Sequence, residues 1–147
     1  MCGAHATVRG FIGELVSRTP DRLDVLVDME AGLEHLSRGT GKHLSGFLAV
    51  VEPYYRSMET ARRIADLAAG LGVREVMAAT NKIRSEADRQ LVNDFCAAHG
   101  IPVVAEIPYD STLVEAERAA RPPLDFNPNA PAVLAIGRLA ETLLHRS

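Results

Sequence analysis

Short apolar runs alternate with segments of helical periodicity along most of this chain of 147 residues. The run Phe47–Val51 is continuously apolar, as expected of a strand that is buried on both faces of a sheet. Similar runs lie at Leu23–Asp28, Val76–Thr80 and Val103–Ile107. Because strands that alternate with helices favour a parallel sheet covered by helices, the sequence predicts an α/β fold with a partial, mostly parallel sheet of about four strands.

Helices are predicted between and after these runs, where apolar residues recur at i, i+3 and i+4. They cover residues 6–18, residues 57–71, the segment from Ser85 to Gly100, a short segment near Thr112, and the segment from Ala130 onward. The residues predicted to face the core are Met58, Ala61, Ala65 and Ala68, then Leu91, Phe95 and Ala98, and finally Val133, Ile136, Leu139 and Leu143.

Two smaller features concern how these segments start and how they are joined. Ser85 with Asp88, and Thr112 with Glu115, have the spacing of helix N-cap signals. The proline-rich segment 121–129 is predicted to be a rigid, extended connector before the last helix.

Composition and charge narrow the classes of function. Hydrophobic residues make up 47% of the chain, and its length fits one domain over residues 1–147. The net charge of −3, with no concentrated basic face, argues against nucleic-acid binding. No apolar run approaches the roughly 20 residues of a membrane span. Two cysteines, Cys2 and Cys96, form no disulfide framework, so a cytoplasmic location is expected.

Polar residues follow the predicted strands at the points where ligands bind in open α/β sheets. Asp28, with Gly32 four residues on, has the arrangement of a Walker B segment. There the carboxylate reaches a magnesium ion directly or through water, and the glycine lets the backbone approach a phosphate. The alternative is that Asp28 only caps a turn between strand and loop.

The pair Asn81-Lys82 ends another predicted strand. The Asn81 amide offers both a donor and an acceptor, which suits the edge of a purine base. As with Asp28, the alternative is a residue that caps a turn. Two polar strand ends in order along the chain favour a ligand site more than either one does alone.

The segment Val27–Thr40 resembles the Walker B segment of CooC-type ATPases. These are MinD/ParA relatives that assist nickel insertion into carbon monoxide dehydrogenase. The segments Val51-Glu52-Pro53, Asn81-Lys82 and Ile107-Pro108-Tyr109-Asp110 resemble later parts of the same family, so the resemblance covers essentially the whole chain. It implies the C-terminal portion of a SIMIBI-class P-loop NTPase fold.

The resemblance also implies ligands and partners, namely ATP or ADP with Mg, a homodimer, and carbon monoxide dehydrogenase. No role is assigned to Glu30, Glu34 or His35. The site residues that it implies are Asp28 for magnesium through water, Gly32 near the γ-phosphate, Asn81 with Lys82 at the adenine edge, and Pro108 with Tyr109 along the base.

One departure from the family concerns the phosphate-binding loop. A Walker A loop is glycine-rich and carries a lysine, and its backbone N–H groups hold the phosphates. The Gly41-Lys42 pair is followed by His43 and follows no predicted strand, so it does not fit. We therefore expect this chain alone to bind nucleotide feebly and not to hydrolyse ATP. Two alternatives remain, a non-enzymatic interaction module and a receiver-like domain with Asp28 as phosphoacceptor and Lys82 as its lysine.

A further expectation concerns Cys2, which precedes His5 in a stretch that resembles the residues after a Cys-x-Cys pair in the family. That pair holds a metal between two subunits. Our hypothesis is that Met1 is the middle residue of such a pair, which would leave Cys2 as half of a zinc or nickel site in the intact protein. The alternative is an unoccupied thiol. Without the P-loop strand beside it, the predicted strand Leu23–Asp28 would also have a bare edge, which predicts self-association.

Overall fold

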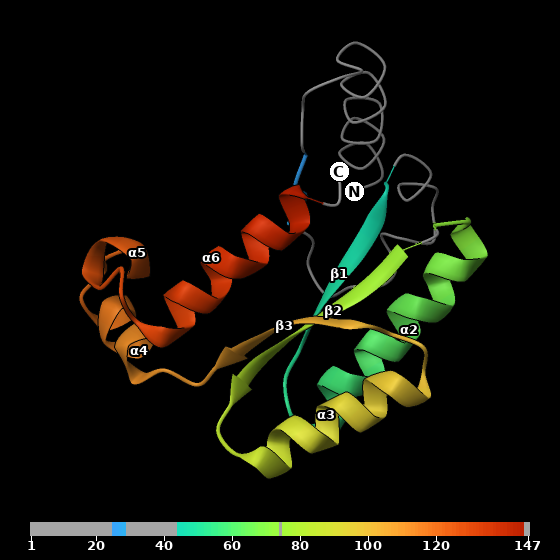
Figure 1. Ribbon diagram of the computed structural model, residues 1–147, viewed down its shortest axis with the longest axis horizontal. Coiled ribbons are helices and arrows are strands. Elements are labelled where there is room, and N and C mark those ends of the chain that lie inside the picture. The colour runs from blue at the N-terminus through green and yellow to red at the C-terminus, as the bar shows by residue number, and fades with distance from the viewer. Residues whose placement is uncertain (1–24, 29–43, 74, 146–147) are drawn as a thin grey trace, which may run out of the picture.

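The computed structural model describes residues 25–28, 44–73 and 75–145 (Figure 1). Its described strands form one parallel sheet in the order β1-β2-β3. The strands are β1 (Gly46–Val51), β2 (Glu75–Ile83) and β3 (Val103–Pro108). The described helices are α2 (Tyr55–Leu71), α3 (Glu86–Ala98), α4 (Ser111–Arg118), α5 (Pro123–Phe126) and α6 (Pro131–Leu144).

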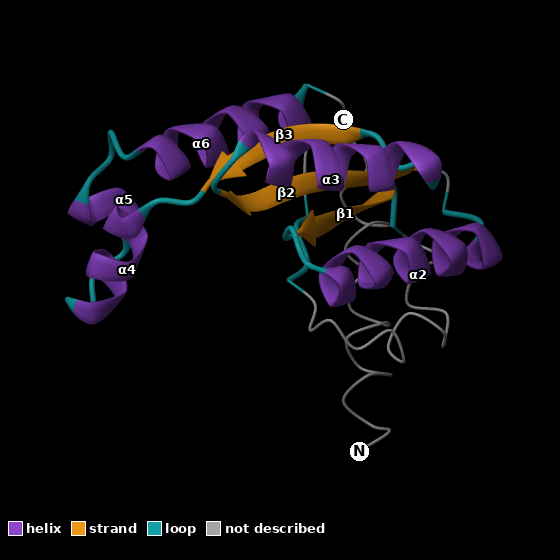
Figure 2. Ribbon diagram, turned by 90° about the horizontal axis from the view of Figure 1, so that it is seen from below, coloured by secondary structure: helices purple, strands orange, loops and turns teal. Residues whose placement is uncertain are grey.

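Helices cover both faces of the sheet. Adjacent residues of a strand point to opposite faces. On β3, Glu106 pairs with Arg89 of α3, whereas Ile107 packs with Ala132 and Ala135 of α6. Helices α3 and α6 therefore lie on opposite faces, and α2 packs beside α3 (Figure 2).

The main core lies between the sheet and the helices α2 and α3. In β1 the residues Ala49 and Val51 face these helices and pair in register with Ala78 and Thr80 of β2. The buried residues of this cluster are Ala49, Val51, Met58, Ala61, Ala78, Ile83, Val92, Cys96 and Ile101. A smaller cluster joins Phe47, Ala68 and Val73 near the other end of α2.

The structure confirms the α/β class and three of the predicted strands, but not a fourth. Residues 25–28 have no regular secondary structure, and Leu26 is 88% exposed. A strand is stabilised by ladder hydrogen bonds to a neighbour, and these residues do not pair with the described sheet. The rest of Leu23–Asp28 and the predicted helix 6–18 lie outside the described residues.

The predicted helices are present in the described part of the chain, and two predicted core faces were only partly right, since Leu139 is buried and Phe95 is partly buried as predicted but other predicted residues are not. Helix α2 buries Met58, Ala61 and Ala68 as expected. Helix α3 instead buries Val92 and Cys96, while Leu91 is 49% exposed. Helix α6 buries Ala132, Ala135 and Leu139, while Ile136 is 45% exposed. The small side chains of Ala132 and Ala135 pack against Ile107 of β3.

Local signals were predicted with mixed success. Ser85 is the N-cap of α3, since its hydroxyl accepts from the Asp88 N–H. For α4, however, the cap is Asp110 and not Thr112. The segment 121–129 is not wholly extended, because it contains the single turn α5. Pro123 is the first residue of that turn, where its missing N–H costs no helical hydrogen bond. No described helix is long and apolar enough to cross a membrane.

Candidate functional site

The carboxyl ends of β2 and β3 are held together by their ladder. Thr80 pairs with Glu106 and Ile83 with Pro108, with an irregularity in register between them. Beyond the last pair, the Tyr109 N–H donates to the Ile83 carbonyl at 2.9 Å. Asn81 and Lys82 therefore lie on the strand beside the one that carries Pro108 and Tyr109.

Lys82 connects the end of β2 to the end of β1. Its backbone is left-handed, with φ of 57°. Its Nζ lies 2.9 Å from Oε1 of Glu52, the residue after β1, and this hydrogen bond raises the pKa of Lys82 above its ordinary value. Glu52 is positioned in turn, because its N–H donates to the Ser57 hydroxyl at 2.9 Å.

Asn81 lies within β2 and its side chain is held by a local hydrogen bond. Its Oδ1 accepts from the N–H of the next residue, Lys82, at 3.0 Å. An amide oxygen has two lone pairs, and the Nδ2 group has two hydrogens to donate. Since the oxygen is held by the backbone, the half-buried amide has a defined orientation and retains donor and acceptor capacity toward a ligand.

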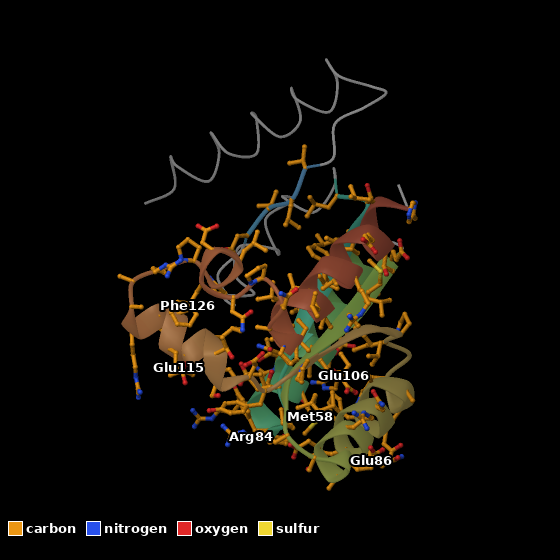
Figure 3. All side chains as sticks on the ribbon, turned by 60° about the vertical axis from the view of Figure 1, so that its left-hand side comes forward. Met58, Arg84, Glu86, Glu106, Glu115 and Phe126 are labelled. Carbon is orange, nitrogen blue, oxygen red and sulfur yellow. The ribbon has the colours of Figure 1, made fainter. Side chains whose placement is uncertain are left out.

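Tyr109 presents an aromatic surface directly after β3. Its side chain is 41% exposed, and the guanidinium carbon of Arg84 lies 3.8 Å from the ring centroid. Arg84 lies at the turn between β2 and α3 (Figure 3). Sequence reasoning missed Arg84, because only the pairing of β2 with β3 brings it to the ring.

Asp110 anchors the loop that carries Pro108 and Tyr109. Its Oδ1 accepts from the Thr112 N–H at 2.9 Å, and its Oδ2 accepts from the Ala132 N–H at 3.2 Å. Partial burial raises the pKa of Asp110, but the hydrogen bonds from Thr112 and Ala132 outweigh it and hold that pKa below its ordinary value. One carboxylate thus joins the loop to the first turns of α4 and α6.

A second charged contact fixes α3 against β3. Arg89 donates to both carboxylate oxygens of Glu106 at 2.6 Å, and it also pairs with Glu86. The hydrogen bond from Arg89 lowers the pKa of Glu106, against the opposing effect of its partial burial. This bidentate pair holds the start of α3, and with it the Arg84 turn, against the neighbouring strand.

The structure does not bring Asp28 to this group of residues. Asp28 is exposed and, among the described residues, makes no hydrogen bond or ion pair with Asn81, Lys82 or Tyr109. In Figure 1 the blue segment 25–28 is drawn near the end of α6, away from the arrowheads of the strands. Gly32, Cys2, Glu30, Glu34 and His35 lie outside the described residues. The described residues contain no cluster of three or more potential metal ligands.

No family model matches the chain. It is 34% identical over 128 residues to the carbon monoxide dehydrogenase accessory protein CooC of Rhodospirillum rubrum, covering 87% of this chain and 47% of that protein. It is 32% identical over 123 residues to the uncharacterized ATP-binding protein MJ0823 of Methanocaldococcus jannaschii, covering 83% of this chain and 47% of the relative. The chain therefore spans about half the length of these relatives.

The fold is similar to that of a solved protein. The MinD cell division protein of Aquifex aeolicus matches with a TM-score of 0.75 and 22% identity, covering 97% of this chain and 61% of that structure. At this identity the likeness shows the fold, which agrees with the parallel sheet and its two helical layers.

Proposed function

Because this chain is a homologue of the CooC-type, MinD-like ATP-binding proteins and spans about half of their length, we propose that it binds an adenine nucleotide. In this proposal Asn81, Lys82, Pro108 and Tyr109 are the residues that would face the base, and we call them the base wall. The observation that supports the proposal is the pairing of β2 with β3, which joins the end of β2 that carries Asn81 and Lys82 to the end of β3, where Pro108 and the exposed Tyr109 lie.

The chemistry of this wall fits adenine. An asparagine amide pairs with the adenine edge by donating one hydrogen bond and accepting another. An aromatic ring that stacks on a base contributes about 1–3 kcal/mol. Pro108 adds a rigid apolar surface next to Tyr109, and the Glu52–Lys82 ion pair holds the Lys82 side chain at the end of β1. These contacts position a base but perform no phosphoryl transfer.

The phosphate side of the proposal rests on sequence resemblance. Asp28 would hold Mg²⁺ through water, and Gly32 would lie near the γ-phosphate. Mg²⁺ sites in proteins use one or two carboxylates together with several waters, so one exposed Asp is compatible with that chemistry. Since Asp28 does not adjoin Asn81 in this structure, we assign no catalytic step to it. Magnesium would supply charge neutralisation of the phosphates when bound.

The biological role is proposed from the CooC relative, which is named as an accessory protein of carbon monoxide dehydrogenase. By the resemblance of the segment Val27–Thr40 to CooC-type ATPases, the complete protein would act as a homodimer that assists nickel insertion into this enzyme. Cys2 would contribute to a metal site between its subunits. These roles belong to the complete protein, because this chain spans about half of the relative.

Binding of a nucleoside tests the base wall without needing a phosphate-binding loop. We expect adenosine to shift the amide resonances of Asn81, Lys82 and Tyr109 in NMR spectra of the isotope-labelled chain. The expected dissociation constant is of the order of millimolar, because stacking and two hydrogen bonds amount to about 4 kcal/mol. Guanosine, whose N7/O6 edge offers two acceptors and no donor, should bind more weakly than adenosine, whose N7 and N6–H pair with the amide.

Asn81→Ala is expected to reduce the preference for adenosine over guanosine about five-fold, which corresponds to about 1 kcal/mol of edge recognition. Asn129→Ala removes an exposed asparagine from the segment before α6, and it should leave the preference unchanged. If adenosine shifts no resonance at the strand ends, the base wall is refuted and the non-enzymatic interaction module becomes the better interpretation.

A further inference from the structure

Arg84 covers one face of the Tyr109 ring. The separation of 3.8 Å between its guanidinium carbon and the ring centroid is a stacking contact, so no base fits between the two groups as they stand. Arginine stacks well on aromatic faces because its guanidinium is planar and weakly hydrated. The guanidinium therefore lies where a base would stack on this face of the ring.

Arg84 differs from the nearby basic residues Lys82 and Arg89 in its ion-pair partners. Lys82 is paired with Glu52, and Arg89 is paired with Glu106 and Glu86. Among the described residues, no carboxylate lies within ion-pair distance of the Arg84 guanidinium, whose described contact is the Tyr109 ring. Moving this guanidinium off the ring therefore breaks no ion pair with the described residues.

The backbone on both sides of the contact is fixed while the side chain is long. The Arg84 N–H donates to Oδ2 of Asp88 at 2.9 Å. The preceding carbonyl, that of Ile83, accepts from the Tyr109 N–H. These bonds hold the two Cα positions, so the rotatable bonds of the arginine can open the stack without moving β2 or β3.

We propose that Arg84 is a second base-contacting residue, which leaves Tyr109 when a purine enters and stacks on the outer face of the base. The base then lies between the phenol ring and the guanidinium. This inference rests on the proposed adenine site and adds a residue to it. Asn81 would discriminate adenine from guanine at the edge, whereas Tyr109 and Arg84 would favour the larger purine ring over a pyrimidine.

The test uses the same labelled chain with adenosine, guanosine and uridine. We expect the Nε–Hε resonance of Arg84 to shift with the same saturation curve as the Asn81 amide. Arg84→Ala should weaken adenosine and guanosine binding about five-fold each, with their ratio unchanged, and weaken uridine binding less than two-fold. Arg121→Ala is a matched control, because Arg121 also lies over an aromatic ring, that of Phe126, but away from the strand ends.

The outcomes separate this inference from the proposed function. If adenosine binds with a preference that depends on Asn81 while the Arg84 resonance stays still and Arg84→Ala binds normally, only the role of Arg84 is overturned. If no nucleoside binds, both are overturned. The wild-type side-chain resonance needs no variant, so a folding defect in Arg84→Ala would not hide the answer.

Discussion

Lys82 shows how one residue can depart from the preference of its strand. A non-glycine residue with φ of 57° is strained by about 1–2 kcal/mol, and such strain often occurs at ligand sites. Here the residue with this backbone conformation is the one whose ammonium reaches the Glu52 carboxylate at the end of β1. The partly exposed pair with Glu52 is worth about 0–1 kcal/mol, so it offsets only part of the strain.

This backbone conformation predicts an inverted substitution pattern at position 82. At an ordinary strand position, a protein with valine is more stable than the same protein with glycine. Glycine adopts positive φ freely. We therefore expect the free energy of unfolding, measured in urea, to be about 1–2 kcal/mol higher for Lys82→Gly than for Lys82→Val. At Val104, inside β3, Val104→Gly should instead lower the free energy of unfolding. A more stable Val variant at position 82 would contradict the left-handed turn.

At the scale of elements, Asp110 joins the loop that carries Pro108 and Tyr109 to the two helices α4 and α6. Asp110→Ala removes the acceptor for the first turn of α4 and for that of α6, so we expect the free energy of unfolding to fall by about 1–2 kcal/mol. Asp110→Asn keeps one acceptor oxygen, so its free energy of unfolding should fall less than that of Asp110→Ala. Urea denaturation at pH 7 measures both. Asp125→Ala, an exposed acid next to Phe126, should have an effect within about 0.5 kcal/mol.

The pH dependence of this effect has a definite sign. The folded-state pKa of Asp110 is lowered, so its stabilisation is present above the ordinary carboxyl range and is lost as the pH falls through the folded-state pKa. The difference in stability between wild type and Asp110→Asn should therefore shrink as the pH falls below the ordinary aspartate pKa of about 3.9. A difference that stays constant as the pH falls below this value would show that the charge of Asp110 is not what holds the loop.

At the scale of the whole molecule, the described sheet has an unpaired edge. In the described part of the chain β1 is an outer strand, and Val50 on the face opposite α2 is 58% exposed. An exposed apolar strand edge favours pairing with another chain. We expect the purified chain to self-associate at micromolar concentration, as measured by sedimentation velocity.

Val50→Lys places a charge on that strand and should shift the population toward monomer. Leu124→Lys is the control, since Leu124 is 63% exposed but lies on α5, away from the sheet. A sharp monomer for the unmodified chain, or an equal effect of both substitutions, would count against association through β1.

The sequence alone predicted most elements of the described fold and the residues at the strand ends. The runs at 47–51, 76–80 and 103–107 became strands, because a continuous apolar run has few alternatives to a buried strand. It also predicted Asn81, Lys82, Pro108 and Tyr109 as neighbours, since the carboxyl ends of parallel strands meet at one edge of a sheet. Their contact with a nucleotide stays a prediction.

Tertiary structure decided what depends on contacts between distant segments. The face of α3 and α6 that is buried is set by packing against the sheet, which buries Val92 and Ala135 and leaves Leu91 and Ile136 exposed. The stack of Arg84 on Tyr109 and the double cap by Asp110 join residues from separate elements. Local periodicity contains no information about such pairs, because they are created only when β2, β3 and α6 pack together.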